Sequence, residues 1–304
     1  MQHIQVDIGT AKLACQIRGE GKYTLIIESA IHACSAEWWP IADQLAKYCM
    51  VITYDRASYG MSSRSSLPRT TDCIVKELSA LIECLKIETP IVFLAHSQGA
   101  FFAQQYSRLY PDNIKGLVLI DPITHAFPQL RYALKPDLYK KSGIDRSNSL
   151  SIPVFLGRLG LLSFFKGMLI KLPPLVYYEF NEDEINYITK HKLRLSSCLA
   201  ALKEQKCFYD CIPFIEDTEL KPFPAVPLKI LYHSPAFMIN EIMHYGPLSK
   251  HEATKIEQLW FDMTSKAIDL SPYSTFAVAR FSGNFMYLSE QKFIIDAVKS
   301  LLNN

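Results

Sequence analysis

The sequence lacks the patterns that mark several classes of binding site. None of its eight cysteines belongs to a paired C-x-x-C pattern, and there is no G-x-G-x-x-G after the first predicted strand, no Walker motif and no H-E-x-x-H motif. These are the usual signals of a structural zinc site, a dinucleotide site, a nucleoside triphosphate site and a metalloprotease centre. We therefore expect neither a cofactor nor a bound metal.

The chain also has little excess of charge of either sign. Its 32 Lys and Arg residues are scattered and nearly balance 30 Asp and Glu residues, which argues against a nucleic-acid partner. The cysteines mostly fall in apolar segments, and the N-terminus shows neither a basic region nor an apolar run. We therefore expect free thiols in a reducing, cytoplasmic location. We also expect no secretory signal.

A long uninterrupted apolar run is missing as well. The most apolar region, residues 152 to 178, is broken by three prolines and three basic residues: Pro153, Pro173, Pro174, Arg158, Lys166 and Lys171. A membrane-spanning helix needs about 20 consecutive apolar residues, so no membrane span is predicted. The region is better interpreted as a buried or lid-forming helix.

What the sequence does contain is an alternation of strand and helix patterns over 304 residues, 49% of them hydrophobic. Helical spacing is clearest over 71 to 87, behind Thr70 or Thr71 as a cap. The order predicts one large α/β domain with a mostly parallel central sheet flanked by helices. Short apolar runs predict strands at 11 to 17, 23 to 28, 50 to 54, 91 to 95, 115 to 120, 227 to 232 and 275 to 280.

The alternation stops between residues 126 and 225, where helical and proline-broken stretches dominate. We therefore expect a core made of residues 1 to 125 and 226 to 304, with a helical cap or lid at 126 to 225. Apolar residues between 155 and 170 exceed what a small packing helix needs, so they are predicted to line a cavity for an acyl chain or a hydrophobic alcohol. A plain helix–sheet interface would carry the same pattern.

Three motifs follow predicted strands, at the edge where open α/β sheets place their sites. The first is Ala-His-Ser-Gln-Gly at 95 to 99, which differs from G-x-S-x-G only in its first residue. Small residues at both ends permit the sharp strand-to-helix turn that presents a nucleophilic serine. The second motif, at 54 to 62, reads YDRASYGMS, and the third, at 28 to 32, reads ESAIH with Trp38-Trp39 beyond it.

Together these motifs resemble the α/β-hydrolases of the cofactor-free serine esterase type, in which YDRxGxGxS follows one strand and HGxG…W another. The resemblance extends to GLVLIDP at 116 to 122 and to the segment at 279 to 298. It implies that Ser97 is the nucleophile and that Ile31 and Gln98 supply the oxyanion hole. Ser29 stands where the family has histidine, but the oxyanion donors are backbone N–H groups, so that role survives.

The resemblance implies a catalytic acid, whose place is less regular. Many members have an aspartate after the strand at 227 to 232, but this turn reads YHSPA and contains no carboxylate. Some relatives, pancreatic-type lipases among them, use the aspartate after the preceding strand, where Asp121 lies. Asp121 is the predicted acid of the triad and Glu241 the alternative.

At the position of the catalytic histidine the sequence departs from the family. Relatives read Ser-Gly-His near the end, whereas this chain reads Ser282-Gly283-Asn284. An amide side chain cannot accept a proton near pH 7, and loss of the base costs on the order of 10⁶ in turnover. Other histidines near this edge are weaker candidates for the base: His32, His96, His125, His233 and His244. In this fold the side chain before the serine is expected to point into the sheet, which disfavours His96.

The resemblance therefore implies a serine hydrolase of carboxylic esters or thioesters, inactive or nearly so because of Asn284. The intact Ser97, Gln98, Gly99 and Asp121 favour an introduced, substrate-trapping histidine-to-asparagine change over the drift of a pseudoenzyme. The substrate is a small molecule or an acyl-carrier-bound ester, which includes the carrier-protein methyl ester of biotin synthesis. The alternative is a catalytically silent ligand-binding protein of the same fold. A cofactor-free lyase or dioxygenase would need the missing histidine, and the oligomeric state stays open.

Overall fold

The protein is described by a computed structural model that covers residues 2 to 303 apart from 125–126, 128–129, 145–146 and 218–220. Its centre is an eight-stranded sheet in the order β1-β2-β4-β3-β5-β6-β7-β8. The strands are β1 (Gln2–Asp7), β2 (Lys12–Arg18), β3 (Thr24–Glu28), β4 (Met50–Tyr54), β5 (Ile91–His96), β6 (Ile114–Ile120), β7 (Leu228–Tyr232) and β8 (Ser274–Val278). The pairs β1–β2 and β2–β4 are antiparallel and the others parallel.

The predicted mostly parallel α/β sheet is thus confirmed, and each of the seven predicted strands is found. The sequence pattern missed β1, which pairs along its whole length with β2 at the edge of the sheet. Four of its six residues are polar and exposed, and only Val6 is buried. An edge strand that buries one side chain leaves almost no apolar signal in the sequence.

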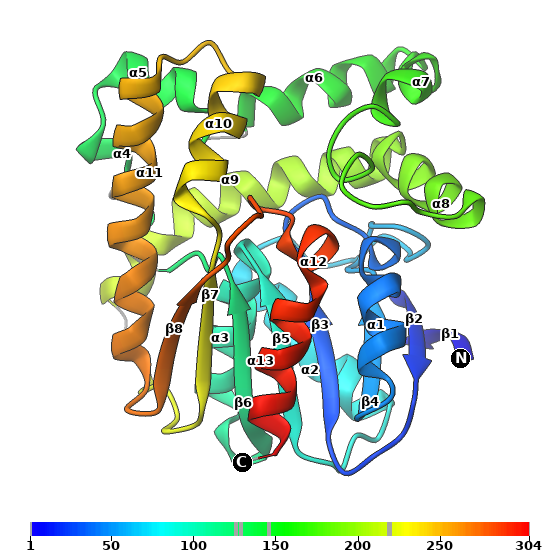
Figure 1. The fold of residues 1–304 in the computed structure, drawn as a ribbon. Coiled ribbons are helices and arrows are strands. Elements are labelled where there is room, and N and C mark those ends of the chain that lie inside the picture. Colours follow the sequence, from blue (N-terminus) through cyan, green and yellow to red (C-terminus); the bar gives the residue numbers. More distant parts are fainter. Residues whose placement is uncertain (1, 125–126, 128–129, 145–146, 218–220, 304) are drawn as a thin grey trace.

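Helices cover both faces of the sheet (Figure 1). One apolar core lies between the sheet and α1 (Trp39–Leu45), α12 (Met286–Ser289) and α13 (Gln291–Leu302). A second core lies on the opposite face, against α2 (Thr71–Cys84), α3 (Gln98–Leu109) and α11 (Lys250–Ser265). The other helices outside the stretch between β6 and β7 are η1 (Ser35–Trp38), η2 (Pro111–Asn113), α10 (Pro235–Tyr245) and η5 (Lys266–Leu270).

Between β6 and β7 the chain forms a set of inserted helices above the sheet (Figure 1). Among the described residues of this stretch no strand interrupts them. No helix in the described part of the chain has the length and apolar character needed to cross a membrane. The inserted helices are α4 (Leu130–Ala133), α5 (Pro136–Ser142), α6 (Ser147–Arg158), η4 (Leu162–Phe165), α7 (Lys166–Leu169), α8 (Glu182–Lys192) and α9 (Leu195–Asp217).

The register of the parallel strands brings their carboxyl ends to one edge. Glu28 of β3 lies opposite Ala95 of β5, and Ile120 of β6 lies opposite both His96 of β5 and Leu231 of β7. The residues that leave these strands therefore gather under the inserted helices. This is the edge on which open α/β sheets build their sites.

Candidate active site

Ser97 occupies a strained turn between β5 and α3. Its φ of 53° and ψ of −119° lie in a region that non-glycine residues rarely adopt. The conformation is held by β6 and the loop after it, because the Ser97 N–H donates to the Ile120 carbonyl at 2.9 Å and the Ser97 carbonyl accepts from the Ile123 N–H at 3.2 Å. Ser97 is half-buried, whereas its neighbours His96 and Gln98 are buried. The turn therefore exposes Ser97 to the cavity that it lines.

Gly99 permits α3 to begin directly against the end of β3. A Cβ at position 99 would lie 2.4 Å from the Ser29 carbonyl oxygen and 2.5 Å from that of Glu28. Both atoms belong to the backbone and neither can move alone, so only glycine fits here. The second small residue of the serine motif thus fixes the distance between the serine turn and the β3 loop.

The two predicted oxyanion residues face the same cavity as Ser97. Ile31 lies in the loop after β3, and Gln98 is the first residue of α3, where helix N–H groups are free of helical partners. Arg56 holds the β3 loop, donating from Nη1 to the Ser29 carbonyl at 2.7 Å and from Nη2 to the Ala30 carbonyl at 3.1 Å. The buried guanidinium of Arg56 therefore holds the backbone of the two residues before Ile31 in place.

Asp121 lies in the turn after β6, in a left-handed conformation with φ of 43°. Its N–H donates to the Leu231 carbonyl at 2.8 Å, which anchors the turn to β7. Its Oδ1 accepts the His233 N–H at 3.0 Å and lies 2.9 Å from His233 Nδ1, at ion-pair rather than hydrogen-bond geometry. Its Oδ2 is buried and accepts no hydrogen bond from the described residues.

His233 bridges Asp121 and a second buried carboxylate, Glu257 of α11. Its Nε2 lies 3.1 and 3.0 Å from the two Glu257 oxygens, and Tyr232 donates its hydroxyl to Glu257 at 2.8 Å. Burial opposes a charge on His233, but Asp121 and then Glu257 outweigh it and raise the pKa of the imidazole to about 10. His233 is consequently protonated at neutral pH and has no lone pair with which to accept a proton.

Asn284 lies in the loop after β8 and lines the cavity with Ser97. Its Oδ1 lies 3.1 Å from His96 Nε2, so the imidazole carries a proton on that nitrogen and donates it. The prediction that His96 points into the sheet is therefore wrong: its ring turns toward Asn284 and lies against those of Trp38 and Tyr287. Among the described residues no hydrogen bond joins Asn284 to Asp121.

Glu241 of α10 supports the same loop. Its carboxylate crowds Gly283, where an added Cβ would lie 1.9 Å from Glu241 Oε2, and it accepts the backbone N–H of Asn284. Burial, with a smaller contribution from the negative charge of Asp121, raises the pKa of Glu241 to about 7. The alternative acid thus contacts the backbone of residue 284.

The cavity above Ser97 has a volume of about 190 Å³. The prediction that residues 155 to 170 line it is wrong, because its walls come from other segments. His244 is exposed on α10, and His125 lies outside the described residues. The apolar lining consists of Ile31, Ile123, Phe127, Ile144, Phe208, Met238, Ile242, Ile256 and Trp260, and the polar groups are Ser97, Gln98, Ser142, Gln205, His233, Glu257 and Asn284.

A second cavity, of about 320 Å³, adjoins the first, since Ile31 and Asn284 line both. Its walls are more polar, with Glu37, Lys192 and the imidazoles of His32 and His96. Lys192 is 3.1 Å from Glu37, so the amine is paired in this arrangement. The loops of Ile31 and Asn284 thus stand between an apolar and a polar space.

Sequence reasoning missed three residues that shape the site: Gln205 of α9, and Glu257 and Trp260 of α11. Glu257 is 4% exposed, yet in the sequence it belongs to an amphipathic helix, where a glutamate normally faces water. The buried His233 and the Tyr232 hydroxyl, both of which contact its carboxylate, reverse that expectation. No local pattern could have found it.

Comparison with known proteins identifies the fold. Residues 23–146 match the protein family described as "alpha/beta hydrolase fold". The esterase of Exiguobacterium antarcticum superimposes with a TM-score of 0.64, at 16% identity, over 100% of this chain and 99% of that one. The chain has the α/β-hydrolase fold. Ser97 and Asp121 thus lie in loops at the carboxyl edge of an α/β-hydrolase sheet.

Two curated relatives match part of the chain. An "AB hydrolase superfamily protein" of Gibberella zeae is 28% identical over 130 residues, which are 39% of this chain and 40% of that protein. The human "(Lyso)-N-acylphosphatidylethanolamine lipase" is 35% identical over 88 residues, 28% of this chain and 26% of the lipase. The matches thus span less than half of either relative.

Proposed function

We propose that this protein is a serine hydrolase of carboxylic esters or thioesters whose turnover is low because residue 284 is asparagine. The observation that carries the proposal is the strained turn at Ser97, which presents a hydroxyl to a cavity that Ile31 and Gln98 also line. Strain of this kind persists where a structure needs one side chain in one place. The resemblance to esterases and a lipase supports the same reaction class.

The chemistry assigned to the site is acyl transfer. The Ser97 oxygen attacks the carbonyl carbon of the substrate, and the backbone N–H groups of Ile31 and Gln98 stabilise the negative oxygen that develops. The alcohol or thiol leaves with a proton, and water then releases the acid from Ser97. Each step needs a group that accepts and returns a proton.

Neither Asn284 nor His233 supplies that group. The Ser97 hydroxyl makes no hydrogen bond to a described residue, Asn284 cannot accept a proton, and His233 is already protonated between Asp121 and Glu257. Binding and oxyanion stabilisation do not depend on the base, so a substrate can bind and persist. We assign Asp121 the role of acid because Oδ2 is the carboxylate oxygen still free to accept from an imidazole.

The cavity limits the substrate. Its volume of about 190 Å³ and its Ile, Phe, Met and Trp walls suit a short apolar acyl or alcohol part rather than a long chain. An acyl part carried on a larger molecule, including a carrier-protein methyl ester, fits if only its end enters. The adjoining polar cavity offers space for the other half of such an ester.

The test is to restore the base. We expect Asn284→His to raise hydrolysis of a p-nitrophenyl short-chain ester by at least about 10³ over the unchanged chain. The restored rate should fall on the acid side as the imidazole protonates, near its ordinary pKa of about 6.5. Steady-state rates between pH 5 and 9, with purified proteins, provide the measurement.

Two further variants serve as controls. Ser97→Ala in the Asn284→His background should abolish the restored rate, and Asp121→Asn should lower it by orders of magnitude through loss of the partner that fixes the imidazole tautomer. A folded Asn284→His protein that stays silent toward short, medium and long esters and thioesters would contradict the proposal.

The second candidate is a catalytically silent ligand-binding protein. Asn284 and the doubly paired His233 favour it, because neither side chain can accept a proton from Ser97 at neutral pH. A fluorophosphonate probe distinguishes the two. Slow labelling of the unchanged chain that disappears in Ser97→Ala indicates a disabled hydrolase, and no labelling indicates a binding protein.

A further inference from the structure

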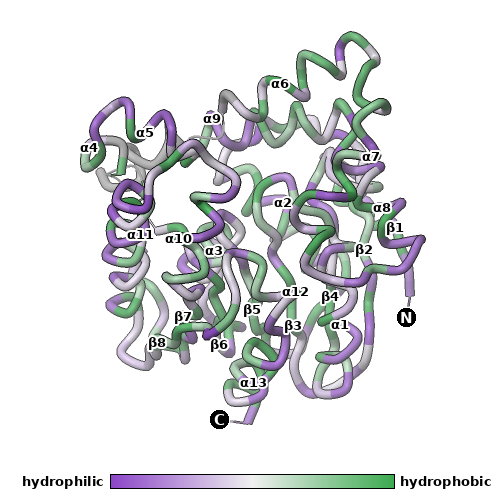
Figure 2. Tube along the Cα trace, turned by 45° about the horizontal axis from the view of Figure 1, so that its top comes forward, coloured by the Kyte–Doolittle hydropathy of each residue, from purple (hydrophilic) through white to green (hydrophobic). Residues whose placement is uncertain are grey.

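The segment formed by α6, η4, α7 and the turns that join and follow them carries many exposed apolar side chains. These helices are the outermost part of the inserted helices (Figure 1), and their apolar colouring stands out along the edge of the molecule in Figure 2. Phe164 is 79% exposed, Phe155 63% and Ile152 62%. We call these side chains the outer apolar face: Ile152, Phe155, Leu159, Leu161, Phe164, Met168, Ile170 and Val176.

The fold does not need this face for packing. The opposite side of the same segment already buries Val154 and Leu162 against Cys198 of α9, with Leu195 and Leu199 beside them. The inner side chains therefore account for the attachment of α6 and η4 to the rest of the protein. Eight large apolar side chains within 25 residues stay in water, which is unusual for a protein surface that meets only solvent.

The charges within the segment that carries the outer apolar face have one sign. From residue 147 to residue 178 the sequence contains no Asp or Glu, whereas Arg158, Lys166 and Lys171 are present and exposed. The chain as a whole is nearly neutral, with 32 basic and 30 acidic residues, so the bias is local. Basic side chains interleaved with aromatic and aliphatic ones match an anionic, apolar surface.

We propose that the outer apolar face docks on the surface of a membrane that contains anionic lipid. The apolar side chains enter the boundary between headgroups and acyl chains, and Arg158, Lys166 and Lys171 remain at the level of the phosphates. The helices lie on the membrane and do not span it. The proposal rests on exposure and charge and is independent of catalysis by Ser97.

A membrane is favoured over a protein partner by the pattern of the face. Its apolar side chains come from α6, η4, α7 and the turns between and after them, and the segment from residue 147 to residue 178 contains three cations and no carboxylate. A protein interface more often sets charges of both signs around its apolar centre. Leu150, Pro153 and Pro173 of the same segment also line the cavity that reaches Asn284, so the docked segment adjoins the candidate site.

Flotation of the full chain with vesicles tests the proposal. We expect binding to phosphatidylcholine vesicles that contain 30 mol% phosphatidylglycerol, weaker binding to pure phosphatidylcholine by about tenfold or more, and loss of that difference in 1 M salt. Phe155→Ser with Phe164→Ser should lower binding to both kinds of vesicle. Replacing Arg158, Lys166 and Lys171 by Gln should lower binding to the anionic vesicles alone.

Matched controls change equally exposed groups elsewhere. Tyr132→Ser with Phe281→Ser removes two apolar side chains that are 84% and 75% exposed, and replacing Lys47, Lys76 and Lys250 by Gln removes three exposed cations. Neither control should change vesicle binding. The proposal is overturned if the unchanged chain binds neither vesicle, if the controls lower binding as much as the test variants, or if the face instead drives self-association abolished by Phe155→Ser.

Discussion

At the scale of single residues, the site is defined by which partner each polar group has. Asp121 shares His233 with Glu257, while Asn284 receives a hydrogen bond from His96 and gives its backbone N–H to Glu241. A histidine between two carboxylates stays protonated, and a carboxylate beside another carboxylate tends to keep its proton. The pKa values of His233 and Glu241 are therefore both raised, so that His233 keeps its positive charge and Glu241 tends to stay neutral.

Glu241 gives a prediction about stability and pH. Its pKa rises from the usual 4.5 to about 7 in the folded chain, so between these values the folded state retains a proton that the unfolded state releases. Its contribution to stability is therefore present below pH 4.5 and is lost as pH rises toward 7. We expect Glu241→Gln, whose amide oxygen can still accept the Asn284 N–H, to raise Tm more at pH 8 than at pH 5.

Thermal unfolding at the two pH values, followed by circular dichroism, measures this difference. Glu88→Gln is the matched control, because Glu88 is exposed and should change Tm equally little at both. An increase in Tm for Glu241→Gln that is the same at pH 5 and pH 8 would show that the carboxyl is not kept protonated by the fold.

At the scale of elements, the serine turn depends on how closely α3 approaches β3. The strand must stop at His96, the helix must start at Gln98, and the third residue after the strand must leave room for the carbonyls of Glu28 and Ser29. The same residues fix both the strained φ of Ser97 and the path of the loop that contains Ile31. The geometry of the site is thus a consequence of helix-to-strand packing.

Gly99→Ala tests that packing. The new methyl would clash with two backbone oxygens that cannot yield independently, so we expect a loss of unfolding free energy of about 1 to 3 kcal/mol. Gly167→Ala in α7 is the matched control, because nothing lies within 4 Å of its added Cβ and alanine favours the helix. Urea denaturation of both variants measures the free energy of unfolding. A Gly99→Ala chain as stable as the unchanged chain would contradict the close approach of α3 to β3.

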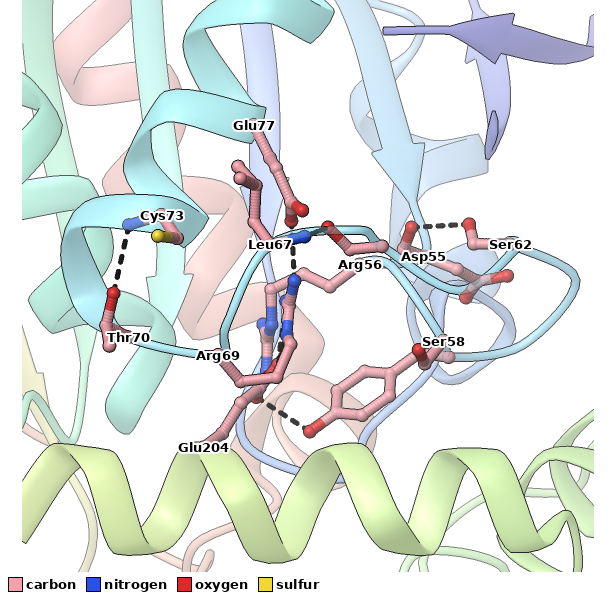
Figure 3. A network of polar contacts seen from close by, with 12 residues as sticks. Asp55, Arg56, Ser58, Ser62, Leu67, Arg69, Thr70, Cys73, Glu77 and Glu204 are labelled. Carbon is pink, nitrogen blue, oxygen red and sulfur yellow. Dashed lines mark hydrogen bonds and ion pairs between the residues drawn. The ribbon is translucent and has the colours of Figure 1, made fainter. Parts of the chain in front are cut away.

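At the scale of the whole molecule, a buried network of charges joins the inserted helices to the sheet (Figure 3). In that view Glu204 rises from α9 toward the guanidinium groups of Arg56 and Arg69. Glu204 lies 3.1 Å from Arg56 and 2.9 Å from Arg69, and these arginines reach Glu28 and Glu77 at 2.7 and 2.6 Å. Since Arg56 also holds the loop before Ile31, α9 and the candidate oxyanion loop are fixed by one network.

Removing one partner of this network should cost more than any surface pair. Burial opposes a charge on Glu204, but Arg56 and Arg69 outweigh it and hold the pKa of the carboxyl below its usual value. Glu204→Gln leaves two buried guanidinium groups with fewer counter-charges, and we expect it to lower the free energy of unfolding by about 3 to 5 kcal/mol. Asp296→Asn, which breaks the exposed pair with Lys292, should cause no measurable change.

Chemical denaturation of both variants gives the comparison. A second change, Arg69→Gln in the Glu204→Gln background, should lower the stability further because it leaves the buried Glu77 carboxylate without its ion-pair partner. If Glu204→Gln unfolds at the same denaturant concentration as the unchanged chain, the network does not hold α9 to the core.

The sequence by itself determined the alternating sheet architecture and the location of the serine turn. Both leave local signals: apolar periodicity selects strand or helix, and Ala95 and Gly99 are the small residues that the turn at Ser97 requires. Among the strands, only β1 was not predicted, because an exposed edge strand needs few apolar residues. Asp121 and Asn284 could also be located relative to their strands, since each follows a recognisable apolar run.

The tertiary structure alone decided the partners and the orientation of side chains. His233 meets Asp121 across 112 positions of sequence, and Glu204 meets Arg56 across 148. Residues 155 to 170 turned out to contribute an exposed face, although their composition alone resembles that of a cavity wall. Charge pairing and the choice between inside and outside depend on which distant segments fold against a residue, and no local pattern records that choice.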